Sequence, residues 1–421
     1  MRVIYPVVVA GAGLVGTAIA RELSARGEKV LLIDRQEPGR GTSYGNMASI
    51  AVNGFDAVSR PSTWKKLPFW MMDPQAPVTA DPRHAVTMIP WFLRFLAAGR
   101  PKRIREIENA GARFATRSLA DIRRLLGEIG APELLSEATC LQLYETEKAF
   151  RDGRDNLDLM ARHGLDYEVL EGDAIRAHEP LLNPAIAKAV LLPQNHFITD
   201  PLGYVARMVE DMRRRGGEFL DGDMARVERD NRGVTAIVLK DGRRIETDRL
   251  VVAAGMETAV FARAMGEPIP LETERGYHTQ IMPPGGADLR YSLIWPERAF
   301  MVTPTAGGIR VGGSVEMAGL TRAPNWRRAR ILVEHARFAV PALKVENITE
   351  WMGHRPALPD TIPILSASST TKGLFYATGH GHLGLTYSAT TGIVMADLVM
   401  GRTPPVGLEP FRIDRFSGIA P

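Results

Sequence analysis

With 421 residues, of which 45% are hydrophobic and 24% charged, the chain is long enough for two globular domains and has no low-complexity tract. Its net charge of +4 is small for this length and gives no support to a nucleic-acid partner. The single cysteine, Cys140, excludes an intramolecular disulfide framework and fits a reducing compartment, and we interpret its side chain as a small apolar group rather than a nucleophile.

The chain begins with the pattern of a dinucleotide-binding motif. Residues 7–10 predict a buried strand, a glycine turn leads into a helix, and a second buried strand follows and ends at Asp34. Gly11 permits the tight turn, Gly13 lets the backbone approach a pyrophosphate at the helix N-terminus, and Gly16 lets the helix pack on the strand. In the sequence, Asp34 follows Gly16 at about the spacing expected of a carboxylate that binds a ribose hydroxyl. The motif predicts a dinucleotide cofactor but does not separate NAD from FAD.

Residues 3–20 carry no charge, which is also a property of membrane spans. The glycine turn and the β-branched run favour a strand, a turn and a helix instead. The basic leader consists of Arg2 alone, so no signal peptide is predicted and we expect a cytoplasmic protein.

Residues 35–48 form a loop rich in glycine and in hydrogen-bonding side chains, directly after the ribose carboxylate. An NAD enzyme would usually enter another crossover helix here. A polar loop suits a longer cofactor, whose phosphates and flavin ring continue past the first turn. The alternative is an ordinary surface loop.

Residues 60–105 are aromatic, basic and interrupted by proline, especially over residues 64–72 and 91–96. Tryptophan and lysine in such segments are typical of docking at a membrane surface. The alternative is a lid or wall whose aromatic side chains pack on the neighbouring domain. Neither segment has a long amphipathic period, which favours the lid.

The middle of the chain changes from helices to strands. Charged and apolar residues alternate over residues 104–126, which predicts helices on the outside of a second domain, and residues 153–201 predict a further series of helices and loops. Thr199 or Asp200 can cap the helix that we predict over residues 204–214.

Strands are predicted over residues 218–220 and 233–239, with a hairpin turn at residues 241–242 and a buried strand over residues 250–255. A three-stranded meander that returns to a buried strand beside the cofactor is a recurring feature of flavoproteins. It is not a feature of ordinary NAD dehydrogenases.

In the last part of the chain, residues 274–283 and 300–314 predict strands of a sheet over the flavin. A helix predicted over residues 388–400 offers a second N-terminus next to a glycine-rich loop.

Taken together, these motifs resemble the flavin-dependent D-amino-acid oxidase superfamily over nearly the whole chain. Bacterial D-amino-acid dehydrogenases are most similar, and glycine oxidase and sarcosine oxidase less so. The resemblance rests on residues 11–16, on Thr42 and Ser43 with Asn46, on residues 275–277, on residues 310–313, on residues 353–356 with Pro359, Asp360 and Pro363, and on residues 378–384. It implies an α/β fold class, with a Rossmann-type, GR2-like FAD-binding domain interleaved with an antiparallel-sheet α+β substrate domain. The implied FAD-binding domain comprises residues 1–57, 196–265 and 350–421, and the implied substrate domain comprises residues 58–195 and 266–349.

The resemblance also implies which residues bind FAD. Asp34 and Arg35 match contacts to the ADP half, although many relatives carry Glu at the position of Asp34. The adenine contact falls around residues 224–225, and the last loop matches the one beneath the pyrimidine end of the flavin. The implied set is Gly11, Ala12, Gly13, Leu14, Val15, Gly16, Asp34, Arg35, Thr42, Ser43, Asn46, Met47, Ala225, Ala254, Gly255, His380, Gly381, His382, Leu383, Gly384 and Thr386.

For the substrate, the resemblance implies that Arg355 binds the carboxylate, because its planar guanidinium suits that group. The alternative is a structural ion pair with Asp360. Tyr277 supplies a second hydrogen bond to the carboxylate or is a packed strand residue. His380 and His382 are expected as cofactor contacts rather than catalysts, and no histidine or cysteine spacing indicates a metal.

The implied reaction is oxidative deamination of a D-amino acid by hydride transfer from Cα to flavin N5, which gives an imino acid and then a 2-oxo acid and ammonia. One alternative is a dehydrogenase of a secondary amine such as D-hydroxyproline, D-proline or sarcosine. The others are a non-catalytic flavin-binding subunit of a hetero-oligomeric amine oxidase and an NAD-dependent dehydrogenase. The implied electron acceptor is a quinone or an electron-transfer partner rather than dioxygen, and residues 64–72 are candidates for peripheral contact with the inner face of the cell membrane.

Overall fold

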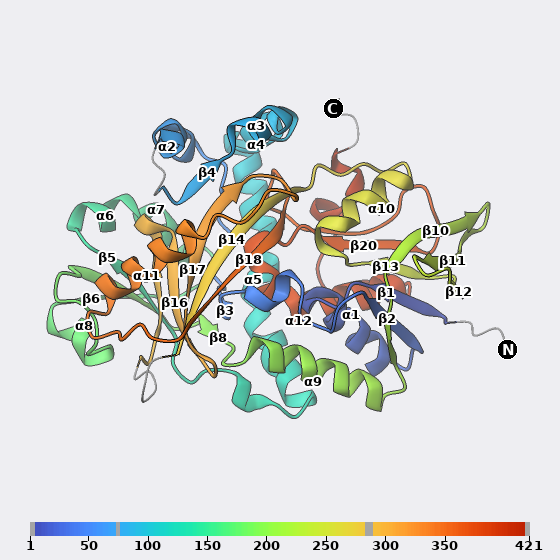
Figure 1. Cartoon of the computed structure of the whole chain (residues 1–421), viewed down its shortest axis with the longest axis horizontal. Coiled ribbons are helices and arrows are strands. Elements are labelled where there is room, and N and C mark those ends of the chain that lie inside the picture. Colours follow the sequence, from blue (N-terminus) through green and yellow to red (C-terminus); the bar gives the residue numbers. More distant parts are fainter. Residues whose placement is uncertain (1–4, 73–75, 283–288, 417–421) are drawn as a thin grey trace.

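The computed structural model describes residues 5–72, 76–282 and 289–416, and Figure 1 shows them arranged around two large sheets. One sheet has six strands in the order β19-β20-β13-β1-β2-β9, in which β19 is antiparallel to β20 and the other pairings are parallel. Its strands are β1 (Val7–Ala10), β2 (Val30–Asp34), β9 (Glu218–Asp221), β13 (Leu250–Val252), β19 (Ile364–Ala367) and β20 (Leu374–Thr378). This Rossmann-like sheet, beside a second and mainly antiparallel sheet, confirms the predicted α/β fold class.

Both faces of the parallel sheet are buried, as is usual where helices or other layers cover each side. Val7 and Val9 of β1 belong to one apolar cluster, and Val8 and Ala10 belong to another on the opposite face. Helices α1 (Leu14–Ala25), α9 (Pro201–Arg214) and α12 (Gly384–Val399) contribute to the first cluster. The second contains the meander β10 (Met224–Asp230), β11 (Gly233–Leu239) and β12 (Arg244–Glu246), with helix α10 (Thr258–Ala264). A meander is therefore confirmed, with the predicted strand over residues 233–239 at its centre. Its first strand is β10 rather than the predicted residues 218–220, because β9 pairs with β2 in the parallel sheet.

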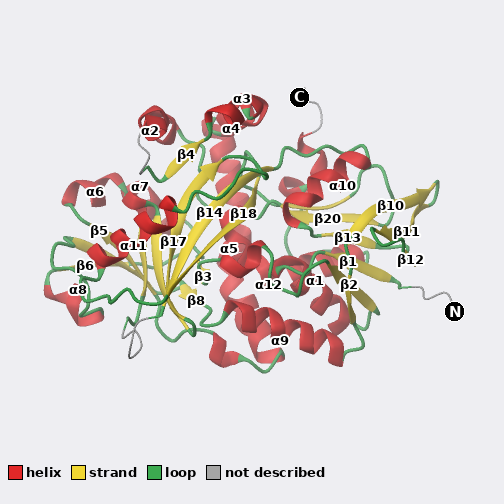
Figure 2. Ribbon diagram, viewed as in Figure 1, coloured by secondary structure: helices red, strands yellow, loops and turns green. Residues whose placement is uncertain are grey.

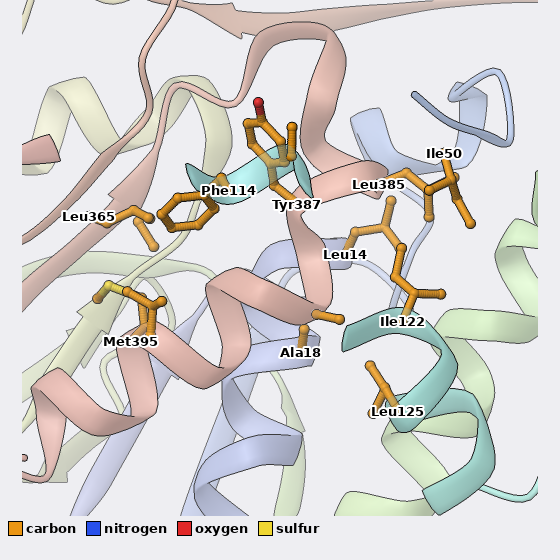
Figure 3. Close-up of a cluster of buried hydrophobic side chains, with 14 of the residues drawn as sticks. Leu14, Ala18, Ile50, Phe114, Ile122, Leu125, Leu365, Leu385, Tyr387 and Met395 are labelled. Carbon is orange, nitrogen blue, oxygen red and sulfur yellow. The ribbon is translucent and has the colours of Figure 1, made fainter. Parts of the chain in front are cut away.

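A single helix of 28 residues, α5 (Pro101–Glu128), lies in the first core cluster. The prediction of outer helices over residues 104–126 is therefore wrong. Figure 3 shows Phe114, Ile122 and Leu125 of α5 packed with side chains of two other helices, which are Leu14 and Ala18 of α1 and Leu385, Tyr387 and Met395 of α12. An apolar stripe at helical spacing shows that one face is buried but does not show against which part of the chain.

The second sheet has the order β18-β14-β17-β16-β15-β5-β7-β6, with β4 paired to β17. Its pairings are antiparallel except for those of β15 with β5 and of β4 with β17. The strands are β4 (Val78–Ala80), β5 (Cys140–Tyr144), β6 (Glu168–Glu171), β7 (Lys188–Leu192), β14 (Glu272–Ile281), β15 (Ser292–Trp295), β16 (Phe300–Thr305), β17 (Gly308–Met317) and β18 (Ile348–Ala357). Residues 153–201 thus contain strands as well as helices, because β6 and β7 pair with each other and β7 also pairs with the distant β5. Pro283, the end of the strand predicted over residues 274–283, lies outside the described residues.

The remaining helices are α2 (Pro61–Met72), α3 (Pro82–Thr87), α4 (Ile89–Ala98), α6 (Glu147–Asp152), α7 (Arg154–Arg162), α8 (Asp173–His178) and α11 (Arg327–Ala339). The short elements are β3 (Ser49–Ile50), β8 (His196–Phe197) and the 3-10 turns η1 (Thr42–Gly45), η2 (Pro132–Leu134), η3 (Gly255–Glu257), η4 (Pro296–Arg298), η5 (Gly381–Leu383), η6 (Glu409–Phe411) and η7 (Ile413–Phe416). Figure 2 shows α2, α3, α4 and β4 grouped at the top of the molecule.

Two helix starts differ from the sequence prediction. Helix α9 begins at Pro201, because Asp200 is the capping residue and its Oδ1 accepts a hydrogen bond from the backbone N–H of Gly203 at 2.9 Å. Helix α12 begins at Gly384 rather than at residue 388. Among the described residues, the helices are all too short or too polar to cross a membrane.

Candidate active site

A single cavity of about 1290 Å³ extends from the glycine turn after β1 to the strands of the second sheet. It exceeds the roughly 300–1,000 Å³ of a site for one small ligand. Its lining includes Gly13 and Asp34 at one end and Arg355 and Trp91 at the other. The cavity therefore joins the predicted cofactor site and the predicted substrate site in one space.

The glycine turn has the close approaches that its sequence predicts. Gly11 has φ of +109°, a conformation that favours glycine. A Cβ at Gly16 would overlap the carbonyl oxygen of Gly11 and would lie 3.0 Å from its carbonyl carbon. A Cβ at Gly13 would lie 2.9 Å from Ser43 Oγ, and this hydroxyl accepts the N–H of Leu14 at 2.9 Å. Helix α1 therefore begins against the loop that follows β2, which leaves its N-terminus beside the cavity.

Asp34 ends β2 and lines the cavity. Its Oδ2 accepts the N–H of Ala12 at 2.7 Å, and its Oδ1 accepts the N–H of Gln36 at 3.0 Å. These two bonds fix the carboxylate, and each oxygen keeps a further lone pair for a ligand hydroxyl. Arg35, which also lines the cavity, forms an ion pair with Glu257.

The loop at residues 42–48 is held by hydrogen bonds within the loop and to the second sheet. Thr42 Oγ1 donates to the carbonyl of His354 at 3.0 Å, which ties the loop to β18. Asn46 Nδ2 donates to the carbonyl of Ser43 at 2.6 Å. Arg310 Nη1 donates to the carbonyl of Asn46 at 2.6 Å. Thr42, Ser43, Asn46 and Met47 line the cavity, so this segment is a wall of the site and not an ordinary surface loop.

The last glycine-rich loop lines the opposite side of the cavity with residues 380–384. His380 is buried, and its Nε2 pairs with Thr391 Oγ1 at 3.1 Å. Burial lowers the pKa of His380 to about 3, so this imidazole is neutral at physiological pH. Thr386 does not line the cavity, because its hydroxyl accepts the N–H of Ala51 at 3.0 Å. The structure therefore does not support the predicted contact of Thr386 with the cofactor.

Arg355 lies on β18, directly across from Glu274 on β14 in the antiparallel register. Its Nη1 donates to the carbonyl of Ser314 at 3.1 Å. Burial lowers the pKa of Arg355, and the charge of Glu274 opposes that shift. Asp360 instead pairs with Arg103 and Arg415, each at 2.9 Å, so the alternative ion pair between Asp360 and Arg355 is wrong.

Ser314 is a strained point beside the arginine. Its φ of +61° is unusual for a residue other than glycine, and the β14–β17 register shifts at the same place. Ser314 Oγ accepts a hydrogen bond from Nε of the buried Arg328 at 2.6 Å, which holds the kinked residue in place. The kink directs the carbonyl oxygen of Ser314 at Arg355.

Tyr277 does not reach the cavity, so its predicted contact with substrate is wrong. Successive strand residues point to opposite faces of the sheet, and Gly276 is the residue that lies against the Arg355 guanidinium. Tyr277 is buried on the other face, where its hydroxyl donates to Glu316 Oε2 at 2.6 Å and accepts the N–H of Asn325 at 3.0 Å. It is the packed strand residue of the alternative interpretation.

Three further residues of the predicted cofactor set do not line the cavity, and these are Ala12, Gly16 and Ala225. The first two act through the backbone of the turn, as described above. Ala225 is exposed, and the adjacent Met224 and Asp223 line the cavity instead, a difference of one residue in the strand.

Sequence reasoning missed Glu274 and His354 as residues that line the cavity. Glu274 belongs to no recognisable motif, and His354 lies in the motif of Arg355 but was given no role there. Only the pairing of β14 with β18 places Glu274 next to Arg355. The aromatic segments contribute Trp70, Trp91 and Phe92 to the cavity wall, which supports the lid interpretation for α2 and α4. Side chains of residues 66–69, 71 and 72 in the segment 64–72 lie outside the described residues.

The residues around the cavity fit an FAD molecule. The first turn of α1 contains no acidic residue and Gly13 adds no capping side chain. Ser43 Oγ accepts the N–H of Leu14, and the remaining N–H groups at this positive end suit a pyrophosphate. Asp34 stands next to it for a ribose, and the cavity continues past residues 42–47 to the N-terminus of α12. Arg355 lines the same cavity.

Comparison with known proteins also indicates an FAD-dependent protein. Residues 6–398 match the DAO family, described as FAD dependent oxidoreductase. The chain is 33% identical to a D-amino-acid oxidase of Bradyrhizobium diazoefficiens over 97% of this chain and 98% of that protein. It is 30% identical to a D-amino acid dehydrogenase of Paramagnetospirillum magneticum over 98% and 99% of the two chains.

Solved structures share the fold. Glycine oxidase from Geobacillus kaustophilus matches with a TM-score of 0.78 and 20% identity, covering 98% of this chain and 99% of that one. L-proline dehydrogenase from P. horikoshii matches with a TM-score of 0.77 and 18% identity, covering 99% and 98%.

Proposed function

The chain belongs to the DAO family of FAD-dependent oxidoreductases, and on this basis we propose that it oxidatively deaminates a D-amino acid. The product is an imino acid, which water hydrolyses to a 2-oxo acid and ammonia. Relatives with the names D-amino-acid oxidase and D-amino acid dehydrogenase, at 33% and 30% identity, support a D-amino acid as the substrate.

The position of Arg355 carries the proposal. Its guanidinium lines the cavity, and among the residues that the structure describes it forms no ion pair within 4.0 Å. A half-buried guanidinium that faces a cavity and forms no such ion pair is a strong site for a ligand carboxylate, because it presents a planar pair of donors. An amino-acid carboxylate placed there forms the direct ion pair with Arg355 that its cross-strand neighbour Glu274 does not form within 4.0 Å.

The residues of this chain bind and orient the substrate. Bound FAD supplies the acceptor for two electrons. Arg355 fixes the carboxylate and thereby the direction of the Cα–H bond, and placement of this kind contributes roughly 7–11 kcal/mol in favourable reactions. Trp91 and Phe92 add apolar surface to the wall of the cavity.

Anaerobic titration of the purified flavoprotein tests this function. The panel contains D-alanine, D-phenylalanine, D-arginine and D-glutamate with their L-enantiomers, and D-proline, D-hydroxyproline and sarcosine. We expect the visible flavin absorbance to bleach with D-amino acids, and the Arg355→Lys protein to keep its flavin but to need much more substrate. Bleaching by none of these compounds would refute the enzyme function and favour the non-catalytic flavin-binding subunit.

The secondary-amine alternative is the second candidate, and the fold shared with an L-proline dehydrogenase is the observation that favours it. Both candidates use the same carboxylate anchor. Bleaching by D-proline, D-hydroxyproline or sarcosine but not by primary D-amino acids would select the second candidate.

For the electron acceptor we propose a quinone reached by peripheral contact with an anionic membrane. Large apolar side chains are exposed on α3 and α4, namely Val86, Ile89 and Leu93, the last with 61% of its surface accessible. Exposed basic residues Arg83 and Lys102 lie on neighbouring helices, which is the charge that anionic lipid attracts.

Flotation on liposomes with anionic lipid tests this contact. An Ile89→Ser, Leu93→Ser protein should lose flotation, whereas Val260→Ser, a change at an equally exposed valine on α10, should not. Equal flotation of all three proteins would remove the reason for a membrane contact.

A further inference from the structure

Glu274 and His382 meet on the cavity wall beside the substrate anchor and have no part in the mechanism given above. His382 Nε2 donates to Glu274 Oε2 at 2.8 Å. Glu274 comes from β14 and His382 from η5, so the bond joins the second sheet to the loop at the N-terminus of α12. Both residues line the cavity, and Glu274 is the direct cross-strand partner of Arg355.

The charge states of the pair follow from its surroundings. Burial raises the pKa of Glu274, but the hydrogen bond from His382 and the charges of His382 and Arg355 outweigh this effect and hold it below its usual range. Glu274 is therefore an ionised acceptor. Because the Glu274 carboxylate accepts the hydrogen bond from Nε2–H, Nδ1 is the ring nitrogen that can accept a further proton.

Other titratable groups near His382 do not provide a comparable base. On β18, His354 pairs with Thr273 Oγ1 and burial lowers its pKa, and Arg355 is a cation. On the same loop, His380 is buried and pairs with Thr391, whereas 53% of the His382 side chain is exposed. Helix α12 carries its acidic residue, Asp397, near the opposite end, where it pairs with Arg26.

We propose that Glu274 and His382 form a dyad that accepts the proton of the substrate α-ammonium before oxidation. This inference rests on the proposed function. An N–H bond of the ammonium breaks and its electron pair stays on nitrogen, while the proton bonds to Nδ1 of His382. Glu274 balances the imidazolium charge, and the exposed ring then releases the proton to water. No electron is transferred in this step, and the amine gains the lone pair that its oxidation requires.

The experiment measures the anaerobic rate of flavin reduction against pH for the wild type, His382→Gln and Glu274→Gln. The probe is the amino acid of the panel above that bleaches the wild type fastest. At pH 7 we expect the His382→Gln rate at low substrate to fall roughly 10²-fold or more, the usual range for loss of a general base. The pH at which the rate reaches its plateau should move upward, toward the pKa of the free ammonium, and the rate should recover there.

Two controls separate this role from a purely structural link between β14 and the loop. Benzoate has a carboxylate but no amine, so its dissociation constant, measured from the flavin spectrum, should change less than twofold in His382→Gln. His178 ends α8, pairs with the hydroxyl of Tyr291 and does not line the cavity. The His178→Gln protein should therefore keep the wild-type pH profile. Flavin content and the thermal midpoint of each variant verify folding.

The outcomes are distinguishable. If no compound of the panel reduces the wild-type flavin at any pH, the proposed function itself fails. If the wild type is reduced and the pH profiles of His382→Gln and Glu274→Gln coincide with that of the wild type, the dyad is refuted and the proposed function stands.

Discussion

Substitution of Gly276 by alanine moves the substrate anchor without changing any residue that we expect to touch substrate. A Cβ at Gly276 would lie 2.6 Å from Nε of Arg355 and closer still to Cζ and Nη2. Gly276 has a negative φ within β14, so alanine suits its backbone. The overlap involves only the far end of a flexible side chain, and Arg355 yields before the sheet does.

The expected magnitude follows from the bonds that are lost. A hydrogen bond to a charged group contributes about 1.5–3 kcal/mol. A guanidinium pushed from its position loses at least one such bond to the carboxylate, which corresponds to a fall of roughly 10- to 150-fold in kcat/KM. The free energy of unfolding should change by less than about 1 kcal/mol, the usual size of a glycine-to-alanine effect in a strand.

Steady-state kinetics with the preferred amino acid and an artificial electron acceptor provide the assay. We expect Gly276→Ala to raise KM, to keep bound FAD and to unfold at the wild-type temperature. Gly307→Ala is the matched control, since the nearest atom to a Cβ there is 3.9 Å away, on Gln280. Wild-type kcat/KM in Gly276→Ala would refute the role of Arg355 at its present position.

Substitutions of Gly16, Tyr277 and His380 test the glycine turn, the structural role of the tyrosine and the pH dependence of stability. In Gly16→Ala, the Cβ overlaps the Gly11 carbonyl, so we expect a lower ratio of flavin to protein absorbance and a lower thermal midpoint, and wild-type values would contradict the close packing. Tyr277→Phe removes the hydroxyl that donates to Glu316, so urea denaturation should show a loss of about 1–3 kcal/mol while KM stays unchanged, and the reverse result would restore a substrate role. The pKa of His380 is about 3 in the folded chain and about 6.5 in the unfolded chain, so the unfolded state binds the extra proton between these values. The free energy of unfolding should therefore fall by up to about 1.4 kcal/mol per pH unit as the pH drops from 6.5 toward 3. The His380→Gln protein should lose this share of the slope between pH 7 and pH 5, and an unchanged slope would show that His380 binds its proton equally in the native and unfolded states.

The sequence by itself determined the parts of this protein whose contacts are local. The glycine turn, the strand that ends at Asp34 and the hairpin of the meander each lie within a short segment, where residue type and spacing dictate the backbone conformation. The motif around Arg355 was recognisable because its residues are adjacent in the chain.

Tertiary structure alone decided the features that depend on long-range register. A shift of one residue places Gly276 rather than Tyr277 on the cavity face, and nothing in the strand sequence fixes that choice, because both faces of β14 are buried. The pairing of Glu274 with His382 joins segments 108 residues apart. The buried position of α5 likewise depends on which distant helices cover its apolar stripe. Local spacing sets the shape of a segment, whereas its partners are set by the packing of the whole chain.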